Sequence, residues 1–253
     1  MRDAAAGFAG PDGVARVPYY DVGESVETAA HRPASQAPML RTALLTTLVA
    51  VPVFADTAFT VDPAAGRNQF TAVFDATVGE RIVAVSSEVG CAITVDERAR
   101  VGSARCSVPL KSVRVDAHET KTEHFRQWAT NAQGDPAACR LDVALGPVTV
   151  PSPAAAGAPV TVETPVTFTV CGRRRDDGGA ERARITVAEA APARAGAPRL
   201  LRIRAHVDGF DRERYRVGPR FTPGWLARVE ELAGVVAPIG TIDVSLFATA
   251  PAE

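Results

Sequence analysis

Residues 201–205, Leu-Arg-Ile-Arg-Ala, carry the pattern that decides the fold of this 253-residue chain. Apolar and basic side chains alternate along them, so that one face of the segment is apolar and the other carries arginine. Successive side chains of a β-strand point to opposite faces of the sheet. The period of two therefore predicts a strand that is buried on one side and wet on the other.

The same alternation recurs along the chain after residue 56, at 70–75, 140–145, 166–170 and 242–246. Stretches of turn-forming residues separate such segments, at 151–159, 173–179 and 190–198. We expect an all-β domain of roughly nine or ten antiparallel strands. Because the sequence shows no βαβ repeat, a closed antiparallel β-barrel is favoured over an α/β fold.

Two short helices are expected to interrupt the strands. The first is predicted to begin at Asp116, which would act as the N-cap, with Glu119 three residues later completing a capping box. It would carry Phe125 and Trp128 on one face and end near Asn131.

The second helix is predicted to begin at Thr222, because a capping threonine is followed there by a proline that the first turn tolerates. Apolar residues at helical spacing then form one stripe, which comprises Trp225, Val229, Leu232 and Val236.

The segment 39–55, MLRTALLTTLVAVPVFA, indicates the compartment of the protein. A methionine and an arginine precede a short apolar run that ends in small residues, which is typical of a secretory signal peptide. The run is shorter than the roughly 20 residues that cross a bilayer, so no stable membrane span is expected. Residues 1–38 are interpreted as a disordered or mis-assigned extension, and 56–253 as a periplasmic or secreted domain. The alternative is a buried core segment that follows a genuine tail.

Four cysteines of the exported part, Cys91, Cys106, Cys139 and Cys171, allow three disulfide pairings. A hairpin that turns through residues 96–103 would bring Cys91 opposite Cys106, and that bond would contribute about 3 kcal/mol in the chain-entropy model. Elimination would then pair Cys139 with Cys171. The alternation of the segments around Cys139 and Cys171 does not place the two side chains on the same face. Either a bulge brings the two cysteines together, or both remain buried thiols.

The sequence contains few residues arranged as in a known catalytic site. A net charge of −1 argues against a nucleic-acid partner. Asp116 and His118 could form an acid/base pair, but a cap beside a surface histidine is the plainer interpretation. Thr122 stands where a zinc-protease helix would place its second histidine. We therefore expect no catalytic residue, metal ion or cofactor. The run Arg173–Arg175 is interpreted as a solvated turn balanced by nearby acids, with an anion site as the alternative.

The order of the segments resembles the YceI-like family of lipid- and polyisoprenoid-binding proteins of the bacterial envelope. The resemblance spans about residues 58–248. Its motifs are an opening strand, a strand that enters a helix with an acid and a histidine, a late aromatic motif and a closing strand. They lie at Phe59–Pro63, Val108–Val113 with Asp116–His118, Gly209–Tyr215, and Gly240–Val244.

The resemblance implies a lipocalin-like antiparallel barrel whose tunnel holds a long isoprenoid or fatty chain. The interior of a barrel of about eight strands is either filled by its own side chains or holds one small ligand. We expect the inward stripes to form the ligand-binding lining, with Trp225 and Trp128 at its border. The lining residues are Phe70, Phe74, Leu141, Val143, Phe168, Val170, Ile203 and Ile242. Val115 and Arg216 depart from the family pattern, as do the four cysteines, and these departures affect the identity of the ligand.

The favoured function is thus an exported, non-enzymatic carrier or store of an amphiphile. One alternative is an enzyme that acts on a lipidic substrate with Asp116 and His118. Another is an envelope interaction module, built as a β-sandwich with a solid core. The sequence leaves the oligomeric state open, a homodimer included.

The export hypothesis predicts that the mature protein begins at Asp56. N-terminal sequencing of protein isolated from its own envelope or secreted fraction measures this directly. A mature chain that begins at Met1 would contradict the export hypothesis and would remove its support for the disulfides.

Overall fold

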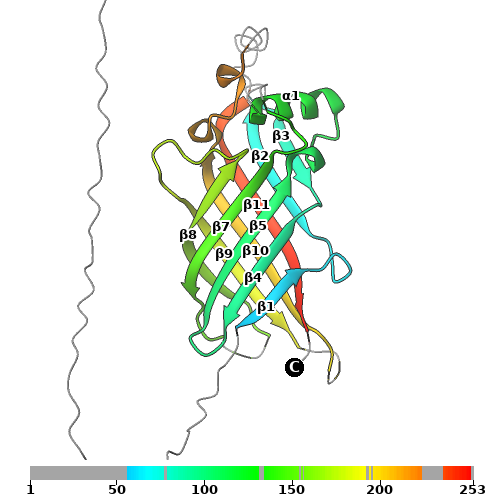
Figure 1. The fold of residues 1–253 in the computed structure, drawn as a ribbon, viewed down its shortest axis with the longest axis vertical. Coiled ribbons are helices and arrows are strands. Elements are labelled where there is room, and N and C mark those ends of the chain that lie inside the picture. The colour runs from blue at the N-terminus through cyan, green and yellow to red at the C-terminus, as the bar shows by residue number, and fades with distance from the viewer. Residues whose placement is uncertain are drawn as a thin grey trace, which may run out of the picture. The chain divides into compact units, whose positions relative to one another are not determined.

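The structure of this chain is a computed structural model. It describes residues 56–251 apart from 77–78, 131–133, 154, 156, 192–193, 195 and 224–235. The predicted signal segment 39–55, the extension 1–38 and most of the predicted second helix lie outside the described residues. Strands tilt around a common axis in Figure 1 and enclose the apolar core.

Eleven described strands form one antiparallel sheet. Their bounds are β1 Thr57–Val61, β2 Gln69–Ala76, β3 Arg81–Ser86, β4 Gly90–Asp96, β5 Val101–Pro109, β6 Arg114–Val115, β7 Arg140–Thr149, β8 Val160–Val170, β9 Glu181–Ala190, β10 Arg199–Asp211 and β11 Val236–Ala250.

The sheet closes on itself through β1. In the order β1-β4-β5-β7-β8-β9-β10-β11, each strand pairs with the next, and β11 pairs back with β1. These eight strands make a closed ring, which leaves no free edge within it. The predicted all-β, lipocalin-like antiparallel barrel is therefore confirmed, and the alternative of a solid β-sandwich is wrong.

Strand β11 is long enough to pair with two strands along the same edge. Its Val236–Ser245 part pairs with β2, and its end pairs with β1 through Ala248 and Thr249. Strand β3 pairs with β2, and β6 pairs with β3, so these three short strands widen the wall at one end of the barrel. We call this end, which carries α1 in Figure 1, the upper end; β1 lies toward the lower end.

A buried asparagine satisfies the backbone at the fork where β11 passes from β2 to β1. The side chain of Asn68 is 5% exposed, and its Oδ1 accepts the backbone N–H of Phe247 at 2.7 Å. Its Nδ2 donates to the carbonyl of Asp62 at 3.1 Å. An unpaired buried N–H is costly, so this amide permits one strand to have two partners.

The inward faces of the strands are apolar, as the alternation predicts. The buried set includes Phe70 and Phe74 of β2, Phe168 of β8 and Leu246 of β11. At Gly240 of β11, beside β2, there is no room for a side chain. A Cβ on Gly240 would lie 2.3 Å from the carbonyl oxygen of Val73.

Short helices cover the upper end. They are η1 (Leu110–Ser112), α1 (Glu119–Thr130), η2 (Arg212–Tyr215) and η3 (Pro219–Phe221). The prediction that the first helix starts at Asp116 is wrong, because Asp116 and Ala117 have left-handed φ angles of 49° and 52°. The helix follows only after this turn. The predicted apolar stripe of the second helix lies outside the described residues, except for Val236, which is the first residue of β11.

Both disulfides are present in the structure. Cys91 and Cys106 are directly opposite each other on β4 and β5, with their Cα atoms 4.0 Å apart, as the hairpin argument predicts. Cys139 bonds to Cys171 with a Cα separation of 4.6 Å. The mismatch of phase disappears because Cys171 lies beyond the end of β8 and has a φ of 46°, so it no longer follows the alternation of that strand.

The fork predicts that alanine substitutions at two adjacent polar residues differ sharply in their effect on the free energy of unfolding. We expect Asn68→Ala to lower the free energy of unfolding by about 1–3 kcal/mol, because it leaves the partly buried N–H of Phe247 without an acceptor. Gln69→Ala is the matched control: the Gln69 amide donates to the hydroxyl of Thr71 on the same face of β2, and its loss is expected to cost less than about 0.5 kcal/mol. Urea denaturation measures both values. Equal costs for the two variants would contradict this account of the fork.

Candidate ligand-binding cavities

Two apolar cavities lie inside the barrel. The upper cavity, of about 280 Å³, is bounded by α1 and by strands that include β2, β3, β5 and β11. The lower cavity, of about 150 Å³, is enclosed by β4, β5 and the strands from β7 to β11. The cavities are adjacent, because Phe70, Val108 and Ile242 line both.

The structure places every described residue of the predicted lining on one of these cavities. The upper cavity receives Phe74, Leu141 and Val170, the lower one Val143, Phe168 and Ile203, and both receive Phe70 and Ile242. Trp128, predicted at the border, lines the upper cavity. Trp225 lies outside the described residues. The side chains are thus brought together, and their contact with a ligand stays a prediction.

Charged groups line one cavity and not the other. Among the described residues, the upper lining includes Glu80, Lys121, His124, Arg140 and Arg212, whereas the lower lining has no charged side chain. In the part of the chain that the structure describes, a bound molecule with one polar and one apolar end would therefore find charged partners only at the upper end. An apolar chain is the chemistry that suits the remainder of the interior.

Helix α1 is fastened over the upper cavity by a buried threonine. Thr122 is fully buried, its Oγ1 donates to the carbonyl of His118 at 2.8 Å and it accepts the backbone N–H of Val115 in β6 at 2.9 Å. This structural role of Thr122 was not predicted from the sequence. A threonine among the polar residues of an exposed helix gives no signal that it is turned inward.

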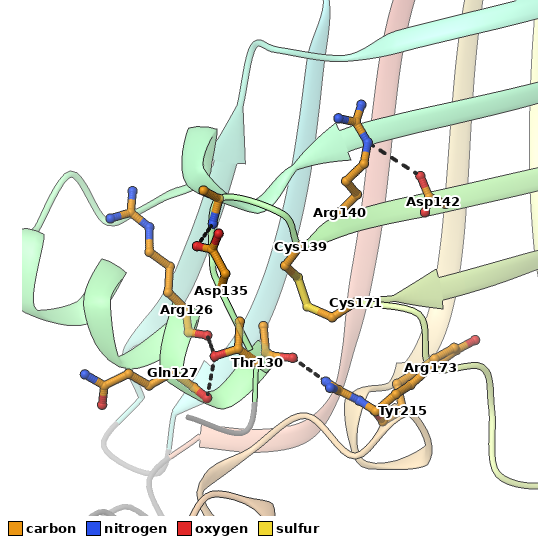
Figure 2. Close-up of a disulfide and its surroundings, with 12 residues drawn as sticks. Arg126, Gln127, Thr130, Asp135, Cys139, Arg140, Asp142, Cys171, Arg173 and Tyr215 are labelled. Atoms are coloured by element: carbon orange, nitrogen blue, oxygen red, sulfur yellow. Dashed lines mark hydrogen bonds and ion pairs between the residues drawn. A yellow bond between two sulfur atoms is a disulfide. The ribbon is translucent and has the colours of Figure 1, made fainter. Parts of the chain in front are cut away.

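The end of α1 is held by a cation beside the second disulfide. Arg173 follows Cys171 and donates to the carbonyl of Ala129, in the last turn of α1, and to that of Tyr215 at 3.0 Å. Figure 2 shows its guanidinium pointing to the end of the helix, with the Cys139–Cys171 bond beside it. A cation at a helix C-terminus is favourable. Burial lowers the pKa of Arg173, and the nearby Arg216 lowers it further.

An aromatic column supports the same region from below. The ring of Phe210 lies edge-on to Phe168 at 5.3 Å and stacks on Tyr215 at 5.0 Å. The hydroxyl of Tyr215 donates to Glu181 at 2.8 Å, and Arg175 pairs with Glu181 at 3.0 Å. Desolvation and the bond to Glu181 raise the pKa of Tyr215. Arg175 also pairs with Asp177 at 2.7 Å, so this arginine is balanced by acids as predicted. Arg173 departs from the predicted solvated turn, because it donates to main-chain carbonyls.

Asp116 and His118 do not face the interior. One oxygen of Asp116 accepts the backbone N–H of Val83 at 2.8 Å and the other pairs with Lys121 at 2.8 Å. Burial alone would raise the pKa of Asp116, but the hydrogen bonds from Lys121 and Val83 outweigh it and lower the pKa. His118 is exposed, and neither residue lines a cavity. The carboxylate therefore serves to fix α1 to β3.

A helix of the length and apolarity that a bilayer crossing requires is not found in the described part of the chain. Clusters of three or more His, Cys, Asp or Glu residues able to hold a metal ion are likewise not found among residues 56–251 as described.

Comparison with known proteins supports the fold. No family model and no curated protein matches the sequence. Among solved structures, the chain is similar to a polyisoprenoid binding domain from Saccharophagus degradans that is implicated in plant cell wall breakdown. The TM-score is 0.50 at 16% identity, and the match covers 77% of this chain and 99% of that domain. The resemblance expected from the sequence is thus confirmed in its fold.

The anchoring of α1 predicts a cost for an isosteric substitution. Thr122→Val keeps the volume but leaves the buried N–H of Val115 without an acceptor, so we expect unfolding to become easier by about 1–3 kcal/mol. Thr161→Val is the control, because Thr161 is exposed and its hydroxyl bonds to that of Thr186 across the β8–β9 pair. Thermal or urea unfolding followed by circular dichroism compares them. Two indistinguishable variants would show that Thr122 does not anchor the helix.

Proposed function

We propose that this protein binds a single apolar chain inside its barrel and acts as an exported, non-enzymatic carrier or store of an amphiphile. The observation that carries the proposal is the pair of adjoining apolar cavities along the barrel interior. The structural neighbour from Saccharophagus degradans, a polyisoprenoid binding domain, supports an isoprenoid or fatty chain as the ligand class.

Burial of hydrocarbon is enough to drive such binding. Each methylene group removed from water contributes roughly 0.8 kcal/mol, so ten of them supply about 8 kcal/mol before the costs of association and chain ordering. No specific apolar contact is needed. The interior requires only a length of open, dry space.

The charged side chains at the upper cavity give the ligand an orientation. Lys121 pairs with Glu80 and with Asp116, each at 2.8 Å, where α1 meets the strands. A polar end group would rest among these charges, and the hydrocarbon would extend away from them toward the lower cavity. Binding in this direction leaves no polar group of the ligand buried without a partner.

The enzymatic alternative has less support. Asp116 and His118, its proposed acid/base pair, lie outside both cavity linings. A substrate chain inside the barrel would not present its reactive atoms to them, because a general base must come within hydrogen-bond reach of the proton it takes.

Two observations support export. Both pairs of described cysteines form disulfides, which persist in oxidising compartments such as the periplasm. The segment 39–55 has the composition of a signal peptide.

Filling the upper cavity should strongly reduce the amount of ligand that the protein retains. Ala84 on β3 lines this cavity, so a phenylalanine there would occupy the space of the chain. Ala92 on β4 is exposed, and Ala92→Phe is the matched control. Native mass spectrometry of protein from its own envelope fraction should show an associated mass of several hundred daltons on the wild type and on Ala92→Phe, and about tenfold less on Ala84→Phe.

Circular dichroism of Ala84→Phe must match the wild type for that comparison to count. A wild-type protein that carries no extractable lipid, and binds none when fatty acids or isoprenoid alcohols are added, would contradict the proposed function.

A further inference from the structure

Three side chains lie at the boundary between the two cavities. Phe70, Val108 and Ile242 line both cavities. Phe70 and Ile242 come from the paired neighbours β2 and β11, and Val108 comes from β5, which pairs with neither of them. Phe70, Val108 and Ile242 are 4%, 3% and 2% exposed. These residues, which we call the partition, stand where a chain that passed from the upper to the lower cavity would have to go.

Neither cavity alone has room for a long chain. An apolar cavity of roughly 150 Å³ engineered into another protein stays dry and admits benzene, and the lower cavity has about this volume. The upper cavity, at about 280 Å³, is close to the lower limit of roughly 300 Å³ for small-molecule pockets. A chain that used both cavities would have to pass the three side chains of the partition.

We propose that the partition sets the length of the chain that this protein accepts, with Phe70 as the specificity-determining residue. This inference rests on the proposed function and deepens it. A single-chain amphiphile that ends at Phe70 binds in the upper cavity with the partition intact. A longer tail must displace the ring, and so it gains little from its additional methylenes. The preferred ligand class is therefore a short to medium fatty chain.

Phe70 is the member of the partition whose side chain can most readily change its rotamer. Val108 and Ile242 are β-branched, and their χ1 angles are restricted by the strands that carry them. The ring of Phe70 has no branch at Cβ, and it is the largest of the three side chains. Its removal therefore opens the widest passage. The neighbouring Ala72, on the same face of β2, leaves space beside it on the upper side.

The test is the dependence of affinity on chain length. Wild-type protein, Phe70→Ala and Phe70→Leu are titrated with a series of unbranched fatty acids of increasing length, by isothermal calorimetry. Burial of one more methylene is worth about fourfold in affinity. For the wild type we expect this gain to stop at a definite length. For Phe70→Ala the gain should continue over several further methylenes, and for Phe70→Leu over fewer.

Phe59→Leu is the matched control for Phe70→Leu. Phe59 is 1% exposed on β1 but lines neither cavity, so the control loses the same atoms from the core. Its length dependence should equal that of the wild type. Val108→Ala provides a second opening of the partition if Phe70→Ala fails to fold, and it should also extend the accepted length.

The results separate the inference from the proposed function. A wild type whose affinity rises without a plateau, or a plateau that stays at the same length in both Phe70→Leu and Val108→Ala, would overturn the role of the partition and leave the carrier intact. Failure of every chain to bind the wild type would overturn the proposed function itself.

Discussion

The pairing of β11 with three strands is the constraint on which the rest of the structure depends. Its Val236–Ser245 part pairs with β2 and its last residues pair with β1, while β10 follows nearly its whole length. The pairing with β1 closes the ring. The pairing with β2 adds strands β2, β3 and β6, which widen the upper end and hold α1 over it. Asn68 makes this fork possible, because it supplies the acceptor that Phe247 would otherwise lack.

A closed barrel can retain a hollow interior, whereas the two sheets of a β-sandwich would pack together and close it. Packed cores lose stability when cavities are left in them, because the surrounding side chains relax only partly. Here each wall strand is fixed by backbone hydrogen bonds on both sides, and two disulfides add covalent restraint at different places. The interior therefore stays open as two cavities, and a bound hydrocarbon would supply the contacts that these cavities lack.

Local patterns predicted the strands, their inward faces and the Cys91–Cys106 bond, because alternation determines which side chains share a face. Features that depend on non-local geometry were not predicted. The left-handed turn at Asp116 replaced a cap, since the same residue type favours both. The alternation of β8 could not predict the direction of the Cys171 side chain, because Cys171 lies beyond the end of that strand. Sequence also shows that Phe70 points inward but not which side chains it meets across the barrel, so the partition could not be foreseen.

The central claim is that an apolar chain lies inside the barrel. The most direct measurement is solution NMR of protein with labelled methyl groups, mixed with a fatty acid whose methylenes are labelled differently. Our account predicts intermolecular nuclear Overhauser effects from the chain to the methyls of Val108 and Ile242, and none to the methyl of Thr161 on the outer wall. Contacts confined to the outer wall or to the exposed face of α1 would contradict it.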